Sequence, residues 1–353
     1  MIKDDKIEAA MENWRLVAQK AQLGAFERRH NSREVCFYHY IDMNLYHLGG
    51  MRHTAQRHRT ALLVLEHILI TRNIWHAAAY VDENLKIPCV ISDPCDVLAE
   101  VSNGQPIIFC GFHTGPYWRV VSELVRLNQS VLIVTPESLT TVYDGFELTF
   151  ERTRHVLASK STLTLLPQKN SWTFLSEIKS AIAERKSVIL FLDGYDRNNS
   201  SGNDELCAFS LLSNEISLLR GKNVSKLALL IGTPIVAFNT ENLASGSHEL
   251  RLNRLPDPAK GMQENDHLAR AHLIYSTLAS SLASNLSQWE GWMYIHGFFR
   301  KRYIESLDPA LFTSADVPQP RMFYDRNYGV VVDKLLLKFY SASVDADPLQ
   351  GIS

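Results

Sequence analysis

The sequence has no excess of charge of either sign, because 36 Lys and Arg stand against 38 Asp and Glu and the formal net charge is −2. Proteins that bind nucleic acids present a dominant basic surface, so this balance argues against general nucleic-acid binding and allows only a local basic patch. Hydrophobic residues make up 46% of the chain and charged residues 21%, which is typical of a globular protein with a sizeable core.

Cysteine is scarce and has no regular spacing. The five cysteines, at positions 36, 89, 95, 110 and 207, show no metal-site pattern, and their number is odd. The 13 histidines likewise show no zinc spacing. We therefore expect a reduced, cytoplasmic chain that binds no metal and no cofactor.

Long apolar runs are also missing. The longest, at 61–65, 188–192 and 226–238, are too short or too interrupted to cross a bilayer. The N-terminal residues 1–14 are charged and lack the apolar core of a signal peptide. A peripheral contact with the inner membrane is the alternative to a purely cytoplasmic location.

Periodic patterns predict the fold class. Apolar residues at helical spacing predict helices over 5–24 and 54–71. From residue 105 onward, short apolar strands alternate with helices, which indicates a mostly parallel sheet with helices on both faces. The expected strands lie within 105–112, 130–135, 187–194 and 233–241, the helices within 118–128, 171–186, 216–232 and 264–303, and a long loop over 195–215.

We interpret the chain, 1–353, as one α/β domain. Residues 1–100 are expected to form a mainly helical collar, 101–303 the α/β core and 304–353 a C-terminal extension. In parallel sheets, catalytic groups gather where strands end at their carboxyl side. His113 and Asp193 each follow an expected strand, so both are predicted to face one cleft.

The residue types at these strand ends suit proton transfer. A histidine near neutral pKa can accept a proton, and a carboxylate can fix its tautomer. Arg220, followed by Gly221, could bind an oxyanion or a phosphate. The alternatives are a turn-forming role for Asp193 and a surface ion pair for Arg220.

The ordered blocks at 107–118, 124–138, 177–196, 218–238 and 288–302 resemble the lysophospholipid acyltransferase superfamily, and within it the late lipid A lauroyl and myristoyl transferases. The resemblance implies a glycerolipid-acyltransferase-like fold and transfer of an acyl or aminoacyl group from a 4′-phosphopantetheine thioester, on a carrier protein or coenzyme A, to a hydroxyl or amine. It makes His113 the general base. The substrate-binding residues we expect are Phe112, Thr114, Gly115, Tyr117, Trp118, Asp196 and Gly221.

The chain departs from the family pattern at one catalytic position. The family has an acidic residue five positions after its histidine, whereas this chain has Trp118. Asp193 is the first candidate to replace the missing acid, and Asp196 and Glu123 are the others. Two alternatives stay open, namely an amine acceptor, which demands less of the base, and a loss of catalysis with retained binding.

Two basic segments, 52–59 and 300–302, could dock an acidic acyl or peptidyl carrier protein. The alternative for the first is a solvated helix face, and for the second a contact with lipid headgroups. The missing membrane anchor favours a soluble acceptor, in specialised-metabolite or lipid biosynthesis. A catalytically silent acyl-chain or carrier-protein binder and a thioester hydrolase remain as alternative functions.

Overall fold

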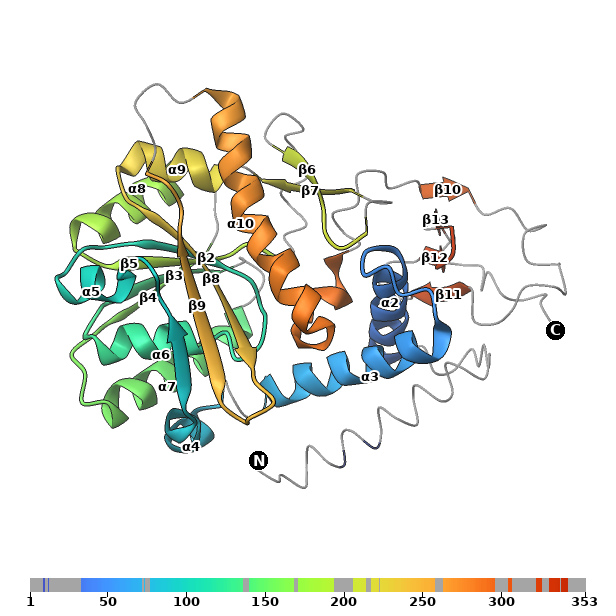
Figure 1. Ribbon diagram of the computed structural model, residues 1–353, viewed down its shortest axis with the longest axis horizontal. Helices are drawn as coiled ribbons and strands as arrows, with labels where there is room; N and C mark the ends of the chain where they lie inside the picture. The colour runs from blue at the N-terminus through green and yellow to red at the C-terminus, as the bar shows by residue number, and fades with distance from the viewer. Residues whose placement is uncertain are drawn as a thin grey trace, which may run out of the picture.

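A seven-stranded sheet forms the centre of the chain in the computed structural model (Figure 1). In spatial order its strands are β1 (Cys89–Ser92), β9 (His248–Arg254), β8 (Ile235–Asn242), β2 (Ile108–Gly111), β5 (Ser187–Phe191), β3 (Val131–Thr135) and β4 (Leu163–Pro167). The strands from β8 to β4 run parallel to one another, while β9 and β1 run in the opposite direction. The mostly parallel α/β sheet predicted from the sequence is therefore confirmed.

Helices cover both faces of this sheet (Figure 1). The helices that the described residues form are α2 (Arg33–His47), α3 (Thr54–Ile70), α4 (Val81–Lys86), α5 (Val97–Ser102), α6 (Arg119–Arg126), α7 (Thr140–Val156), α8 (Ser171–Ala183), α9 (Asn223–Ile231) and α10 (Glu264–Ser284), with short 3₁₀ turns η2 (Ala78–Tyr80), η6 (Leu286–Gln288) and η7 (Glu290–Met293). The structure describes residues 9, 12, 33–71, 73, 77–135, 140–167, 171–193, 206–213, 217–221, 223–257, 263–295, 304–306, 322–325, 330–336 and 338–341.

Alternate residues of the central strands bury their side chains in two separate hydrophobic clusters. In β2, Ile108 and Cys110 belong to the cluster formed with α2, α3, α8, α9 and α10, whereas Phe109 belongs to the cluster formed with α5, α6 and α7. This alternation is the period of two that an extended strand imposes. A sheet that is buried on both faces explains why its strands read as continuous apolar runs.

The order of the strands brings two distant strand ends together. The chain passes from β2 to β3 and β4 before β5 returns to lie between β2 and β3, pairing with both. The register places Gly111 beside Phe191 at the carboxyl ends of β2 and β5. Residues 113 and 193 each follow two positions later, so they leave the sheet at the same level.

Smaller β-elements lie outside the central sheet and correct two sequence predictions. Strands β6 (Leu206–Ser210) and β7 (Ser217–Gly221) form an antiparallel pair. The loop expected over 195–215 is thus wrong for 206–210, and the helix expected over 216–232 is wrong for 217–221, although 223–231 is helical as α9. Pairing between the two segments supplies their main-chain hydrogen bonds, a contact that local periodicity does not reveal.

The helical predictions have mixed outcomes. The helix expected over 54–71 is confirmed as α3, and that within 264–303 as α10 and the 3₁₀ turns. The helix expected over 5–24 lies outside the described residues except for residues 9 and 12, both helical. The sequence analysis missed α2, because this helix is buried on several sides and so lacks a single apolar face.

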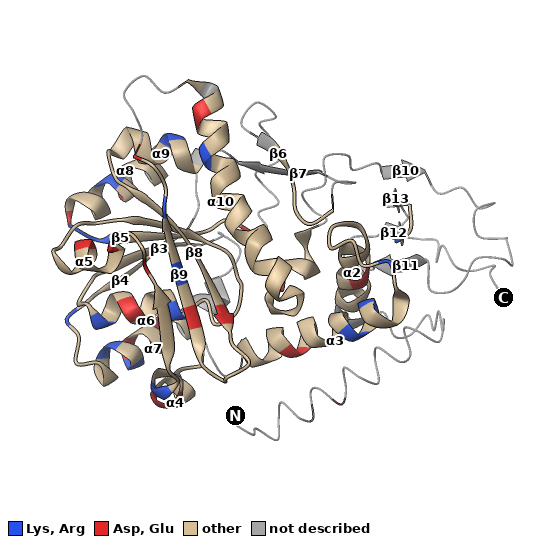
Figure 2. Cartoon of the chain, viewed as in Figure 1, with Lys and Arg blue, Asp and Glu red and all other residues tan. Residues whose placement is uncertain are grey.

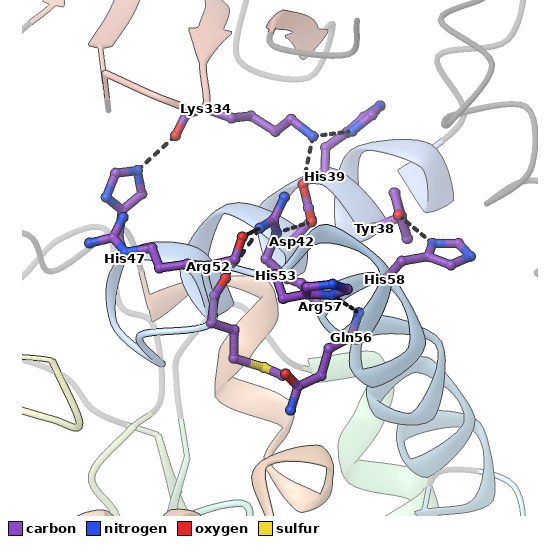
Figure 3. A network of polar contacts seen from close by, with 11 residues as sticks. Tyr38, His39, Asp42, His47, Arg52, His53, Gln56, Arg57, His58 and Lys334 are labelled. Atoms are coloured by element: carbon purple, nitrogen blue, oxygen red, sulfur yellow. Dashed lines mark hydrogen bonds and ion pairs between the residues drawn. The ribbon is translucent and has the colours of Figure 1, made fainter. Parts of the chain in front are cut away.

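A second sheet contains the described strands of the C-terminal extension. Its order is β10 (Ile304–Ser306), β13 (Lys338–Ser341), β12 (Val330–Asp333) and β11 (Met322–Asp325). Lys334, directly after β12, is buried against α2: its ammonium lies 2.7 Å from Asp42 Oδ2 and 3.3 Å from His39 Nδ1 (Figure 3). His47 Nε2 donates to the Lys334 carbonyl over 2.8 Å. These contacts attach the second sheet to the helical layer.

The buried side chain of His67 allows a test of how burial in α3 affects stability. Burial lowers the pKa of His67, which lies in α3, to about 3. The folded chain therefore keeps this imidazole neutral, whereas the unfolded chain binds a proton near pH 6.5, so stability falls as the pH drops below that value. We expect His67→Gln to reduce the loss of unfolding free energy between pH 7 and 4.5 by about 2 kcal/mol.

Urea unfolding of both proteins at several pH values measures this difference. His155→Gln is the matched control, because it makes the same substitution at an exposed histidine, in the last turn of α7. Parallel pH profiles for the wild type and His67→Gln would contradict the prediction.

Candidate functional site

The structure brings His113 and Asp193 into direct contact at the carboxyl end of the central sheet. His113 Nδ1 lies 2.7 Å from Asp193 Oδ1. The two residues are 80 positions apart in sequence and meet because β2 and β5 are neighbours in register. The carboxylate side chain is completely buried, whereas the imidazole side chain is 21% exposed. The imidazole is therefore the member of the pair that a reactant can reach.

Asp193 accepts three hydrogen bonds from protein donors. Besides the imidazole on Oδ1, Oδ2 accepts the backbone N–H of His113 over 2.9 Å and the indole Nε1–H of Trp289 over 2.7 Å. Burial raises the pKa of the Asp193 carboxyl, but attraction to His113 and these hydrogen bonds outweigh burial and hold that pKa below its usual value. Asp193 is therefore ionised at neutral pH.

An ionised Asp193 determines the tautomer of the neutral imidazole. A carboxylate only accepts hydrogen bonds, so Nδ1 of His113 carries the proton that bridges them. The lone pair of the neutral ring then resides on Nε2. This is the arrangement by which a buried carboxylate prepares a histidine to accept a proton.

Aromatic rings fix the plane of the imidazole. Phe191, the last residue of β5, stacks on His113 with ring centroids 4.5 Å apart and planes 23° apart. Tyr117 meets the same imidazole edge-on at 4.7 Å and 89°. Both rings limit rotation of His113. The face of Phe191 also favours a positively charged imidazole, since aromatic faces attract cations.

The backbone after His113 is clamped from both sides. The Thr114 carbonyl accepts the Thr240 hydroxyl over 2.5 Å, and the Gly115 N–H donates to the Gln288 carbonyl over 2.8 Å. Glu290 N–H donates to the His113 carbonyl over 3.1 Å. The loop that bears the imidazole is thus bound to β8 on one side and to the segment after α10 on the other.

Two of the expected substrate-binding residues, Phe112 and Trp118, are packed into the core. Phe112 is fully buried in the cluster with α10, where its ring lies 5.8 Å from that of Tyr275. Trp118 is buried in the opposite cluster and stacks on Phe146 of α7. The structure therefore places Phe112 and Trp118 in different hydrophobic clusters, on opposite faces of the sheet. Of the expected aromatic lining, Tyr117 contacts the imidazole.

Four further residues were predicted to belong to the site, namely Glu123, Asp196, Arg220 and Gly221. Glu123 pairs with Arg119 and Arg126 on α6, so this acid is engaged away from the imidazole. Arg220 and Gly221 end β7, and the position of the Arg220 side chain lies outside the described features. Asp196 lies outside the described residues. Their expected binding roles stay predictions.

Sequence analysis missed Trp289 and Phe191 as site residues. The dense aromatic segment that begins at Trp289 was a signal, because it is rich in side chains that can donate from a buried position. Phe191 ends β5 two residues before Asp193, so an extended chain through Asp193 could have placed both side chains on one face.

Two basic side chains of segment 52–59, Arg57 and His58, make internal contacts with α2 (Figure 3). Arg57 Nε lies 2.5 Å from Asp42 Oδ1, and His58 Nδ1 lies 2.7 Å from the Tyr38 hydroxyl. Arg52 is exposed and covers the Tyr46 ring. Figure 2 shows acidic and basic residues interspersed over the described elements, without a dominant basic face. Segment 300–302 lies outside the described residues.

Metal-site and membrane-span features are both missing from the part of the chain that the structure describes. Within it, no three His, Cys, Asp or Glu side chains are grouped as a metal site requires. None of the helices that the described residues form is both long and apolar enough to cross a membrane.

Comparisons with known proteins give only a remote likeness in structure. No family model matches the sequence, and no curated protein matches it significantly. Among solved structures, the chain is similar to the 1-acyl-sn-glycerophosphate (LPA) acyltransferase PlsC from Thermotoga maritima, with a TM-score of 0.32 and 13% sequence identity, over 72% of this chain and 95% of that chain. A likeness this remote carries no argument about activity, so the function is argued from the residues at the site.

Gly115 tests the clamp on the imidazole loop. Its φ is +52°, and a Cβ added there would meet the Thr240 carbonyl oxygen at 2.3 Å. We expect Gly115→Ala to lower the unfolding free energy by about 3 kcal/mol or more, because backbone strain and a steric clash add.

Gly246→Ala is the matched control. Gly246 also has a positive φ, +82°, but a Cβ there would meet nothing within 4 Å. Its cost should be about 1 kcal/mol, the strain of the left-handed backbone alone. Urea unfolding measures the two losses of unfolding free energy. Equal losses would show that the close contact of Gly115 with β8 does not affect stability.

Proposed function

We propose that this protein is an acyltransferase in which His113 is the general base and Asp193 is the acidic partner that orients it. The hydrogen bond between the buried Asp193 carboxylate and Nδ1 of His113 carries the proposal. This hydrogen bond supports Asp193, which follows another strand, as the substitute for the acid that the family pattern has at the position of Trp118.

The chemistry follows from the orientation of the imidazole. His113 Nε2 accepts the proton of an acceptor hydroxyl or amine as that group attacks the thioester carbonyl carbon. The tetrahedral intermediate then collapses, the C–S bond breaks, and the imidazolium returns its proton to the departing thiolate. The products are an ester or amide and a free thiol, so atoms and charge balance. Asp193 stabilises the imidazolium formed between the two steps.

The proposed donor is an acyl or aminoacyl thioester on the 4′-phosphopantetheine arm of a carrier protein or of coenzyme A. The ordered motifs that resemble the lipid A acyltransferases support this donor class. Backbone N–H groups or Arg220 are the proposed donors to the oxyanion. The acceptor is a small-molecule hydroxyl or amine.

The paired side chains also bear on the alternative functions. A silent binder has no need of a carboxylate paired with a partly exposed imidazole, whereas a general base does. This pairing favours catalysis. A hydrolase would use the same pair with water as acceptor, and the products of the reaction distinguish it from a transferase.

Intact-mass spectrometry of acylated carrier protein tests the proposal. The donor is incubated with the protein and a pool of amines and alcohols, and loss of the acyl mass is followed with time. We expect wild-type protein to release the acyl group into a new small-molecule conjugate. His113→Ala and Asp193→Asn should each slow this release by about 10²–10⁴-fold, because base and orienting acid act as a unit.

Glu123→Gln is the control among the acids that the sequence left open. It should react within about twofold of wild type per folded molecule, because Glu123 is engaged with Arg119 and Arg126. Undiminished release by His113→Ala, or no release by the wild type from any donor, would refute the acyltransferase. Release as free acid alone would identify a hydrolase.

A further inference from the structure

The two oxygens of Asp193 have different partners. Oδ1 faces the His113 imidazole, while Oδ2 receives the backbone N–H of His113 and the indole N–H of Trp289. Asp193 and Trp289 both have no exposed surface. Water therefore does not supply donors to Oδ2, and the orientation of the carboxylate depends on these protein groups.

The indole N–H has a property that the imidazole lacks. It can donate a hydrogen bond but cannot accept one, so it stabilises an oxygen that carries negative charge and cannot accept a proton from it. The imidazole, in contrast, can exchange its proton with Oδ1. A donor-only group on Oδ2 therefore keeps the charge on Asp193 and directs proton chemistry to His113.

Trp289 is itself held firmly against the imidazole loop. It forms an antiparallel bridge with Thr114, and the Glu290 N–H beside it donates to the His113 carbonyl. Trp292 meets the indole at 4.9 Å and 72°. At Gly291 a Cβ would lie 2.2 Å from the Trp289 ring, so this close fit requires glycine. Movement of the indole would thus disturb the loop that bears His113.

We propose that Trp289 is a positioning residue, whose indole N–H keeps Asp193 ionised and in the plane that holds the Nδ1–H tautomer of His113. The use of that tautomer to accept a proton at Nε2 rests on the proposed function. The tautomer itself is a property of the protein without substrate, so it can be measured whether or not the protein transfers acyl groups.

The test compares two tryptophans of the same segment. Trp289→Phe keeps an aromatic ring and removes the donor to Asp193. Trp292→Phe is the matched control, because Trp292 is equally buried but donates instead to the Leu286 carbonyl, over 2.6 Å. Both variants lose one buried indole hydrogen bond and similar packing, so stability alone does not separate them.

Nitrogen NMR of ¹⁵N-histidine-labelled protein reports the tautomer. The His113 signals are assigned by their loss in His113→Ala. We expect the wild type and Trp292→Phe to show Nδ1 protonated with a low-field proton, and Trp289→Phe to show a mixture of tautomers without that proton. An unchanged signature in Trp289→Phe would overturn the proposal. Equal loss in both variants would also overturn it, because the cause would then be disturbed packing of the segment.

A second substitution at position 289 tests the proposal if Trp289→Phe does not fold. Benzothienylalanine at position 289 keeps the shape of indole and replaces its N–H by sulfur, so the same loss of signature is expected in a fully folded protein. Where transfer is measurable, kcat of this variant should fall at least about tenfold with KM within about twofold. Absence of transfer in the wild type would refute the proposed function and leave the tautomer result standing.

Discussion

The completely buried carboxylate of Asp193 constrains much of the surrounding structure. A charged group removed from water is destabilising unless nearby donors replace its hydration, so the chain must deliver donors to both oxygens. These donors come from the loop after β2 and from the segment after α10, while Asp193 itself follows β5. Adjacent pairing of β2 and β5, the close approach of Gly115 to β8 and the burial of Trp289 all contribute to this one requirement.

An acid on a neighbouring strand differs physically from one on the same loop as the histidine. On one loop the two groups would move together, whereas here their separation is set by the hydrogen-bonded register of β2 and β5. The sheet is the most rigid part of such a fold, so the imidazole is held relative to the core rather than to its own loop. Trp118, at the position of the family's acid, is then available for packing and stacks on Phe146 in the cluster with α7.

The sequence was informative where structure depends on neighbouring residues and less so where it depends on distant ones. Apolar runs and helical spacing predicted β2, β5 and α3, and the strand ends placed His113 and Asp193 at one edge. The position of β5 beside β2 depends on residues far apart in the sequence, and so does the pairing of β6 with β7. The Leu-rich sequence of β7 also suits a helix. The bond from Trp289 to Asp193 spans 96 positions, which no local pattern encodes.

Charge patterns were similarly ambiguous, and two of the buried carboxylates, Asp42 and Asp193, show why. Asp42 contacts the basic side chains of Arg57 and Lys334, which balance its charge, so its pairing is structural. Asp193 contacts the neutral indole of Trp289 and the titratable imidazole of His113, and its described contacts include no permanent cation. Its negative charge is therefore balanced fully when His113 accepts a proton. That difference makes the Asp42 cluster an anchor and leaves the Asp193 site electrostatically prepared for an imidazolium, the species that a general base must form.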